Sequence, residues 1–155
     1  MSSWYPVLVF AHILSATIWV GGGIMAFFTA RQVEASGDES AKRVFTSIDA
    51  WTGSRPFGPA AFAVVLFGAL MVWQNPAWSL GQLWVWLSLT LALLSMVLGG
   101  AVLGPQSARA AQLAAERGAD DPEVQRIQAR MRVIENFDLL AVIVIVGLMV
   151  FKPGA

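Results

Sequence analysis

The sequence contains one histidine, His12, which lies within the first long apolar stretch. If that stretch crosses a membrane from Trp4 inward, a rise of about 1.5 Å per helical residue places His12 about 12 Å below the outer interface. Ring nitrogens without partners at this depth would cost several kcal/mol, so we expect the ring to point into the protein. Two interpretations stay open: a core histidine hydrogen-bonded to a neighbour, or a ligand to haem iron or copper.

Ser15, Trp19, Gly22 and Gly23 lie on the same helical face as His12, at spacings of three and four residues, and form a stripe. The lower part of this stripe consists of small residues. Such a stripe lets another backbone or a flat ligand approach closely. By the same counting, Met71 lies roughly one turn from the depth of His12, and thioethers ligate copper(I) and haem iron. The predicted cofactor-binding residues are therefore His12, Met71, Ser15 and Trp19, although Met is also an ordinary core filler.

Two carboxyl groups lie near the start of the last apolar stretch. Glu135 and Asp138 are three residues apart and therefore share a helical face. Acidic side chains within a membrane are costly and frequently functional. They are interpreted either as a proton relay or as interfacial ion pairs, with Arg55, Arg130 or Arg132 as the possible partners.

Composition excludes several classes of protein. Hydrophobic residues make up 57% of the 155 residues and charged residues only 13%, about half the charge of a soluble domain. The formal net charge is zero and cysteine is absent, so the sequence offers neither a basic surface for nucleic acid nor a thiolate metal site. A Ser–His–Asp triad, a HExxH helix, a P-loop and a dinucleotide fingerprint are also missing.

Four apolar stretches are long enough to cross a bilayer as helices, which takes about 20 residues. They cover approximately residues 4–28, 56–73, 80–103 and 133–151. Period-two alternation, which would indicate strands, is missing. The sequence therefore predicts a single all-α membrane domain over residues 1–155, a bundle of four transmembrane helices.

Basic residues indicate the orientation of these spans. Four lie in the first loop and five in the third, which together leave only Lys152 on the other side. Since basic loops stay in the cytoplasm, both termini are predicted to lie outside, with Trp4, Tyr5, Trp73 and Trp78 at the outer interface. The expected location is the inner membrane of a bacterium.

The third loop, residues 105–132, has helical signals of its own. Residues 107–117 are rich in Ala, Gln and Arg and end at Gly118, and Asp121–Pro122–Glu123 is typical of a helix start. We therefore predict a helical hairpin on the cytoplasmic side. It is interpreted either as a solvated extension of two spans or as a surface that docks a partner.

The whole chain resembles a family of predicted bacterial four-helix integral membrane proteins that share a domain of unknown function. More distantly, a histidine seven residues before a tryptophan and followed by glycine resembles the first helix of CopD-type copper-resistance proteins and HemJ-type haem-binding proteins. The likeness to the HemJ type implies that His12 takes part in haem binding. The residues that carry the family resemblance are His12–Gly22, Arg55–Ala60, Gly104–Pro105 and Asp138–Gly154.

These observations predict an integral membrane protein that binds haem b or copper in a redox or metal-handling role. The alternative is a non-catalytic subunit or scaffold that docks a partner through its cytoplasmic hairpin. A small-molecule or lipid carrier ranks third. Besides the lipid bilayer, the expected partner is a second copy of the chain or a larger membrane complex, and no nucleic acid.

Overall fold

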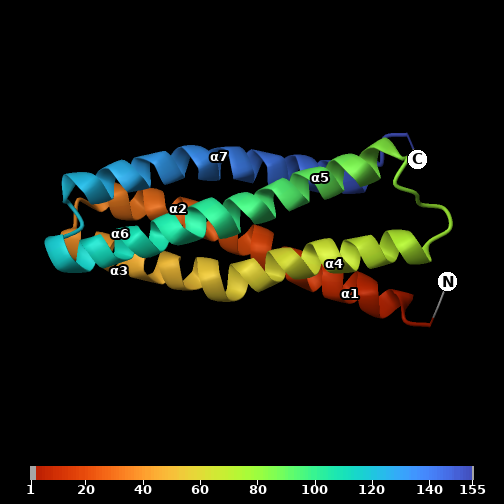
Figure 1. Cartoon of the computed structure of the whole chain (residues 1–155), viewed down its shortest axis with the longest axis horizontal. Helices are drawn as coiled ribbons and strands as arrows, with labels where there is room; N and C mark the ends of the chain where they lie inside the picture. The colour runs from red at the N-terminus through yellow and green to blue at the C-terminus, as the bar shows by residue number, and fades with distance from the viewer. Residues whose placement is uncertain (1–2, 155) are drawn as a thin grey trace.

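The structure is a computed structural model, in which residues 3–154 are described, and it is all-helical. Figure 1 shows long rods lying side by side along the long axis of the molecule. Four continuous helical segments are long and apolar enough to span a membrane. These segments are Tyr5–Ser36, Glu39–Gln74, Leu83–Arg117 and Pro122–Phe151. The predicted fold class, an all-helical protein with four candidate spans, is confirmed.

Each of the first three segments consists of two α-helices joined by a π-helical turn. The fourth segment is a single α-helix. In chain order the elements are α1 (Tyr5–Ala16), η1 (Thr17–Gly21), α2 (Gly22–Ser36), α3 (Glu39–Thr52), η2 (Gly53–Phe57), α4 (Gly58–Gln74), α5 (Leu83–Val97), η3 (Leu98–Leu103), α6 (Gly104–Arg117) and α7 (Pro122–Phe151).

Proline explains two of the π turns. Pro59 and Pro105 each follow a glycine, and a proline inside an α-helix clashes with the carbonyl four residues earlier. In the structure the preceding glycine bonds one residue further back than in an α-helix: the N–H of Gly58 donates to Gly53, and that of Gly104 to Gly99. The wider turn lets both helices continue, so the helical segments run through Pro56 and Gly104–Pro105 without a break.

The four segments pair along their length. In the apolar half α1 packs against α4 and α5 against α7, while in the polar half α6 packs against α3 and α7. Large apolar side chains such as Phe10, Trp73 and Phe137 face outward from the apolar half. An apolar exterior of this kind fits a lipid environment rather than water.

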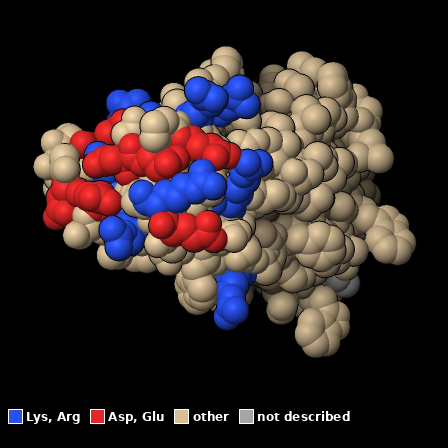
Figure 2. Space-filling view, turned by 60° about the vertical axis from the view of Figure 1, so that its left-hand side comes forward, with Lys and Arg blue, Asp and Glu red and all other residues tan. Residues whose placement is uncertain are grey.

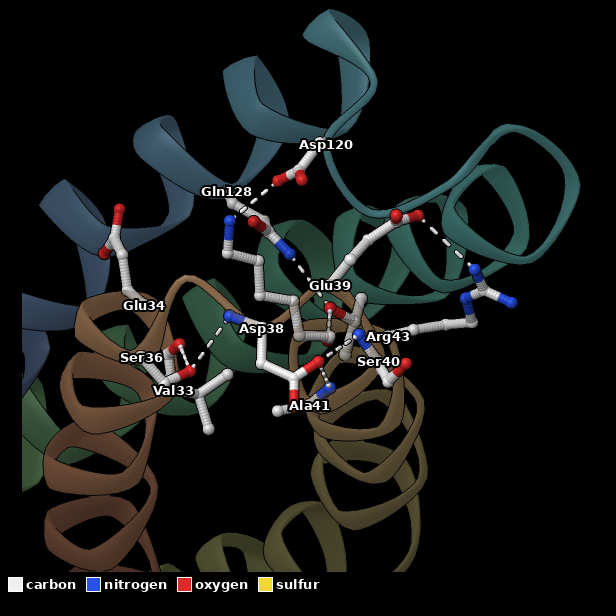
Figure 3. Close-up of polar contacts among 12 residues, drawn as sticks. Val33, Glu34, Ser36, Asp38, Glu39, Ser40, Ala41, Arg43, Asp120 and Gln128 are labelled. Atoms are coloured by element: carbon white, nitrogen blue, oxygen red, sulfur yellow. Dashed lines mark hydrogen bonds and ion pairs between the residues drawn. The ribbon is translucent and has the colours of Figure 1, made fainter.

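The polar residues gather at one end of the molecule, where Figure 2 shows acidic and basic side chains interspersed. Residues 29–55 are predicted as a loop between the first two spans, but in the structure they continue as helix, broken only at Gly37 and Asp38. Gly37 adopts the left-handed conformation with φ 67°, and the Asp38 carboxylate accepts hydrogen bonds from the backbone N–H of Ser40 and Ala41 (Figure 3). This cap starts α3 beside the predicted hairpin.

The hairpin over residues 105–132 therefore does not stand alone. Its helices turn at residues 118–121 and pack against α3, with the Lys42 ammonium 2.7 Å from the Asp120 carboxylate and the Gln128 amide donating to the Thr46 hydroxyl. A small buried cluster closes this end, with Val124 fully buried beside Leu113 and Ala114. Docking of a partner on this end stays a prediction.

Aromatic residues collect at the opposite, apolar end. The Trp78 ring packs edge-on against Trp84, and the Lys152 ammonium lies 4.9 Å from the centre of the Trp78 ring. Trp73 is 84% exposed, as expected of an interfacial anchor. Tyr5, by contrast, is buried against Trp78, so this predicted belt residue packs within the protein.

Candidate functional site

A cavity of about 750 Å³ lies among the helices where the apolar half meets the polar end. Residues from all four helical segments line it, including residues of all three π turns. Its walls combine aromatic rings such as Trp19 and Phe57 with glycines such as Gly99 and Gly100. This volume is within the range of small-molecule sites in proteins.

Five carboxyl groups line this cavity, those of Glu34 and Asp120 and a group of three: Asp49 from α3, and Glu135 and Asp138 from α7. Glu135 is close enough to both of the others to interact with them electrostatically. One carboxyl oxygen of Asp138 is buried without a hydrogen-bond partner among residues 3–154, while Ser95 of α5 lies beside its carboxyl group. A buried polar atom without a partner needs one, either a ligand or water.

Two basic residues, Lys42 and Arg132, line the cavity, but each forms its ion pair with a carboxylate outside this group of three. Arg132 is paired with Glu34 at 2.5 Å, and Lys42 is paired with Asp120. The Lys42 ammonium holds the pKa of Asp120 below its usual value. Within the described part of the chain, the ion pairs of the cavity therefore leave out Asp49, Glu135 and Asp138. We refer to these three residues as the unpaired carboxyl cluster.

Glycine allows the cavity wall to form at the level of the π turns. A Cβ atom added at Gly22 would lie 2.2 Å from Cε1 of the Phe57 ring, far inside van der Waals contact. The neighbouring Gly21 and Gly23 have no such contact within 4 Å. Gly22 therefore lets the ring of Phe57, from η2, lie against the start of α2.

Asp49 and the π turns are features of the cavity that were not predicted from the sequence. The signal was present as a repeated pattern, a glycine followed five residues later by Gly-Pro, at Gly53–Pro59 and again at Gly99–Pro105. Both copies form a π turn beside the cavity. Asp49 had no comparable signal, because it lies in a stretch interpreted as a loop.

His12 is buried, as predicted, and lies between α1 and α4. Its Nδ1 is 2.9 Å from the carbonyl oxygen of Val64, and its ring lies against Gly68, where an added Cβ would be 3.1 Å from Cε1. Since a carbonyl only accepts, Nδ1 carries the proton and Nε2 keeps its lone pair. His12 therefore has the hydrogen bond expected of a core histidine and also keeps one nitrogen that can ligate a metal.

The other predicted site residues do not gather at one place. Trp19 lines the cavity, whereas His12, Ser15 and Met71 are not among its described lining residues. Ser15 is half-buried on α1, and Met71 is half-buried in the last turn of α4.

Arg55 is likewise separate from Glu135 and Asp138. Its guanidinium lies 5.8 Å from the centre of the Trp51 ring, a cation–π contact on the exposed side of the helix. Glu135 and Asp138 share the cavity, and of the three predicted basic partners Arg132 is the one that lines it with them.

A family model described as "Predicted integral membrane protein (DUF2269)" matches residues 6–153. The chain belongs to this family. Membership agrees with the four candidate spans and means that the protein resides in a lipid bilayer, crossing it several times.

No curated protein and no solved structure matches this DUF2269 member. The resemblance of His12 and Trp19 to CopD-type and HemJ-type proteins therefore stays a prediction from the sequence. What the DUF2269 protein binds has to be argued from its own cavity and from the surroundings of His12.

Proposed function

We propose that the protein binds a small organic cation in the cavity of the unpaired carboxyl cluster and exchanges protons for it. The observation that carries the proposal is the charge balance of the cavity, in which Asp49, Glu135 and Asp138 form no ion pair with any described basic residue. Carboxylates removed from water need either a proton or a cation beside them. A bound cation therefore replaces the protons that otherwise neutralise the cluster.

The walls of the cavity suit an organic cation better than a bare metal ion. Among the described His, Asp and Glu residues, no group of three or more is arranged to hold a metal. Trp19 and Phe57 line the cavity, and aromatic rings of this kind can attract an organic cation. A cavity of about 750 Å³ also exceeds what a single ion needs.

The proposal includes an orientation. The polar end carries most of the basic residues, and basic loops are retained in the cytoplasm. We place this end in the cytoplasm of a bacterium, with both termini outside the inner membrane. The cavity then receives its ligand at the cytoplasmic side of the bilayer.

The test uses the lipophilic cation tetraphenylphosphonium as probe. The full chain in detergent is equilibrated with it, and binding is measured by dialysis against pH. Because protons compete for the same carboxyl groups, we expect affinity to increase as pH rises. The triple variant Asp49→Asn, Glu135→Gln, Asp138→Asn should lose most of the binding.

The matched control is Glu116→Gln, which removes an exposed carboxylate of α6 outside the cavity. This control should bind the probe like the original protein. Equal affinities for the triple variant and the control, in samples with the same helical content, would show that the cluster does not bind cations.

A second candidate function, binding of haem b or copper, rests on the surroundings of His12. The hydrogen bond from Nδ1 to Val64 fixes the ring and directs the lone pair to Nε2, the arrangement used by many metal-ligating histidines. Met71 and Ser15 are the residues that the sequence predicts would complete such a site. Protein purified from haem-supplied or copper-supplied cells should show a Soret band or bound copper that His12→Ala removes, and a colourless, copper-free preparation would reject this candidate.

A further inference from the structure

A second hollow lies on the surface of the polar end, between α6 and the first turns of α7. Its volume is about 550 Å³, and no described residue lines both this hollow and the carboxyl cavity. Three arginines line it, Arg109 from α6 and Arg126 and Arg130 from α7, together with Asp121 and Glu123. We refer to it as the arginine hollow.

The fold brings these arginines together from opposite sides of a tight turn. Arg109 lies nine residues before Gly118, and Arg130 lies nine residues after Asp121. Because α6 and α7 run antiparallel on either side of this turn, the two side chains lie at the same height across the groove. Arg126 lies one turn nearer to the tip on the face of Arg130.

The charges in the arginine hollow are not balanced internally. Glu123 is paired with Arg109 at 2.5 Å, and the Asp121 carboxylate caps α7 by accepting from the Glu123 backbone N–H. Arg126 and Arg130 have neither an ion pair nor a hydrogen bond with any other described residue. Two exposed guanidinium groups therefore remain free in one concave surface.

Other basic residues of the polar end already have partners. Lys42, Arg43, Arg117 and Arg132 are paired with carboxylates, and Arg31 lies 4.4 Å from the centre of the Phe27 ring. Arg55 likewise lies 5.8 Å from the centre of the Trp51 ring. Arg126 and Arg130, beside Arg109, are therefore the basic residues of the polar end with neither an ion pair nor a ring contact among the described residues. Such a site selects an anion, and guanidinium groups match phosphate oxygens in geometry.

The position of the arginine hollow relative to the predicted bilayer indicates the source of that anion. Arg130 precedes the predicted span 133–151 by three residues, and Arg109 follows the span 80–103 by six, which places them roughly 5–9 Å beyond the apolar core. Lipid headgroups occupy about this layer. We propose that the arginine hollow binds the phosphate of an anionic phospholipid headgroup on the cytoplasmic side.

The test measures binding of short-chain phosphatidylglycerol to the full chain in detergent by native mass spectrometry, with short-chain phosphatidylcholine for comparison. The variant Arg126→Gln, Arg130→Gln should bind phosphatidylglycerol about fivefold more weakly for each arginine removed, and about thirtyfold in total. Folding is not at risk, since both side chains are exposed and without partners, and a thermal melt checks this. Phosphatidylcholine binding should be weak and unchanged.

The matched control is Arg31→Gln, Arg55→Gln, which removes the same charge near the same interface but outside the arginine hollow. It should retain phosphatidylglycerol binding. An equal loss in the control would mean diffuse attraction and would overturn the site. Displacement of the lipid by millimolar inorganic phosphate would instead identify a soluble phosphate as the ligand, which also contradicts the proposal.

Discussion

Gly22 offers a sharp test of the packing between the π turns, because its two neighbours in the sequence are also glycines. A Cβ at Gly22 would lie 2.2 Å from Cε1 and 2.6 Å from Cζ of Phe57, whereas Gly21 and Gly23 have open space. The Gly22→Ala variant must therefore displace the Phe57 ring from the cavity wall. Gly23→Ala differs from it by one position and has no such conflict.

The magnitude follows from two opposing effects. Replacing glycine by alanine within a helix stabilises it by roughly 0.5–1 kcal/mol, and this gain is common to both variants. Overpacking costs about 1–3 kcal/mol, and it applies only at Gly22. We expect Gly22→Ala to be less stable than Gly23→Ala by about 1–3 kcal/mol, or roughly 2–12 °C in melting temperature.

Thermal unfolding in detergent, followed by circular dichroism, measures this difference. The double variant Gly22→Ala, Phe57→Ala removes the conflicting ring and should be less destabilised than the sum of the two single variants. If Gly22→Ala and Gly23→Ala melt together, the contact between Gly22 and Phe57 is refuted, and with it the position of this ring in the cavity wall.

Three further predictions concern other contacts. Gly68→Ala should push the His12 ring away from α4 and weaken the hydrogen bond between His12 and Val64, which destabilises the protein by about 1 kcal/mol. Thermal melting measures the loss of stability, and the chemical shifts of the His12 ring report its displacement. Gly118→Ala should cost about 1–3 kcal/mol in the same melting assay, because Gly118 has φ 94°, a conformation that alanine adopts only under strain. Lys42 lowers the pKa of Asp120, so the ion pair stabilises the fold fully at pH values above the ordinary pKa of 3.8. This stabilisation is lost as pH falls through the lowered pKa. Asp120→Asn should therefore remove the decrease in melting temperature that protonation of Asp120 causes in acid.

Much of the fold was predictable from the apolar stretches alone. Their length and lack of charge indicated four helices, and Gly118 with Asp121 correctly marked the turn between α6 and α7. The continuity of the helices was not predictable in the same way. Pro59 and Pro105 are helix-breaking signals in isolation, and only the π turns formed with neighbouring glycines allow the chain to continue.

The candidate site was predictable only in part. Glu135 and Asp138 were identified because carboxyl groups are conspicuous in an apolar stretch, but Asp49 comes from a polar stretch and joins them only through the packing of α3. His12 was correctly placed inside the protein, yet its partner Val64 offers a backbone carbonyl, which no side-chain pattern reveals. Trp19 reaches the cavity although His12, on the same stripe, packs against α4.

The proposed exchange of protons for a cation is tested most directly by calorimetry in two buffers of different ionisation enthalpy. Titrating the full chain with tetraphenylphosphonium should release protons, and the number released should fall toward zero in the triple variant of Asp49, Glu135 and Asp138. Tight binding without proton release in the original protein, or an undiminished release in the variant, would contradict the role assigned to these carboxyl groups.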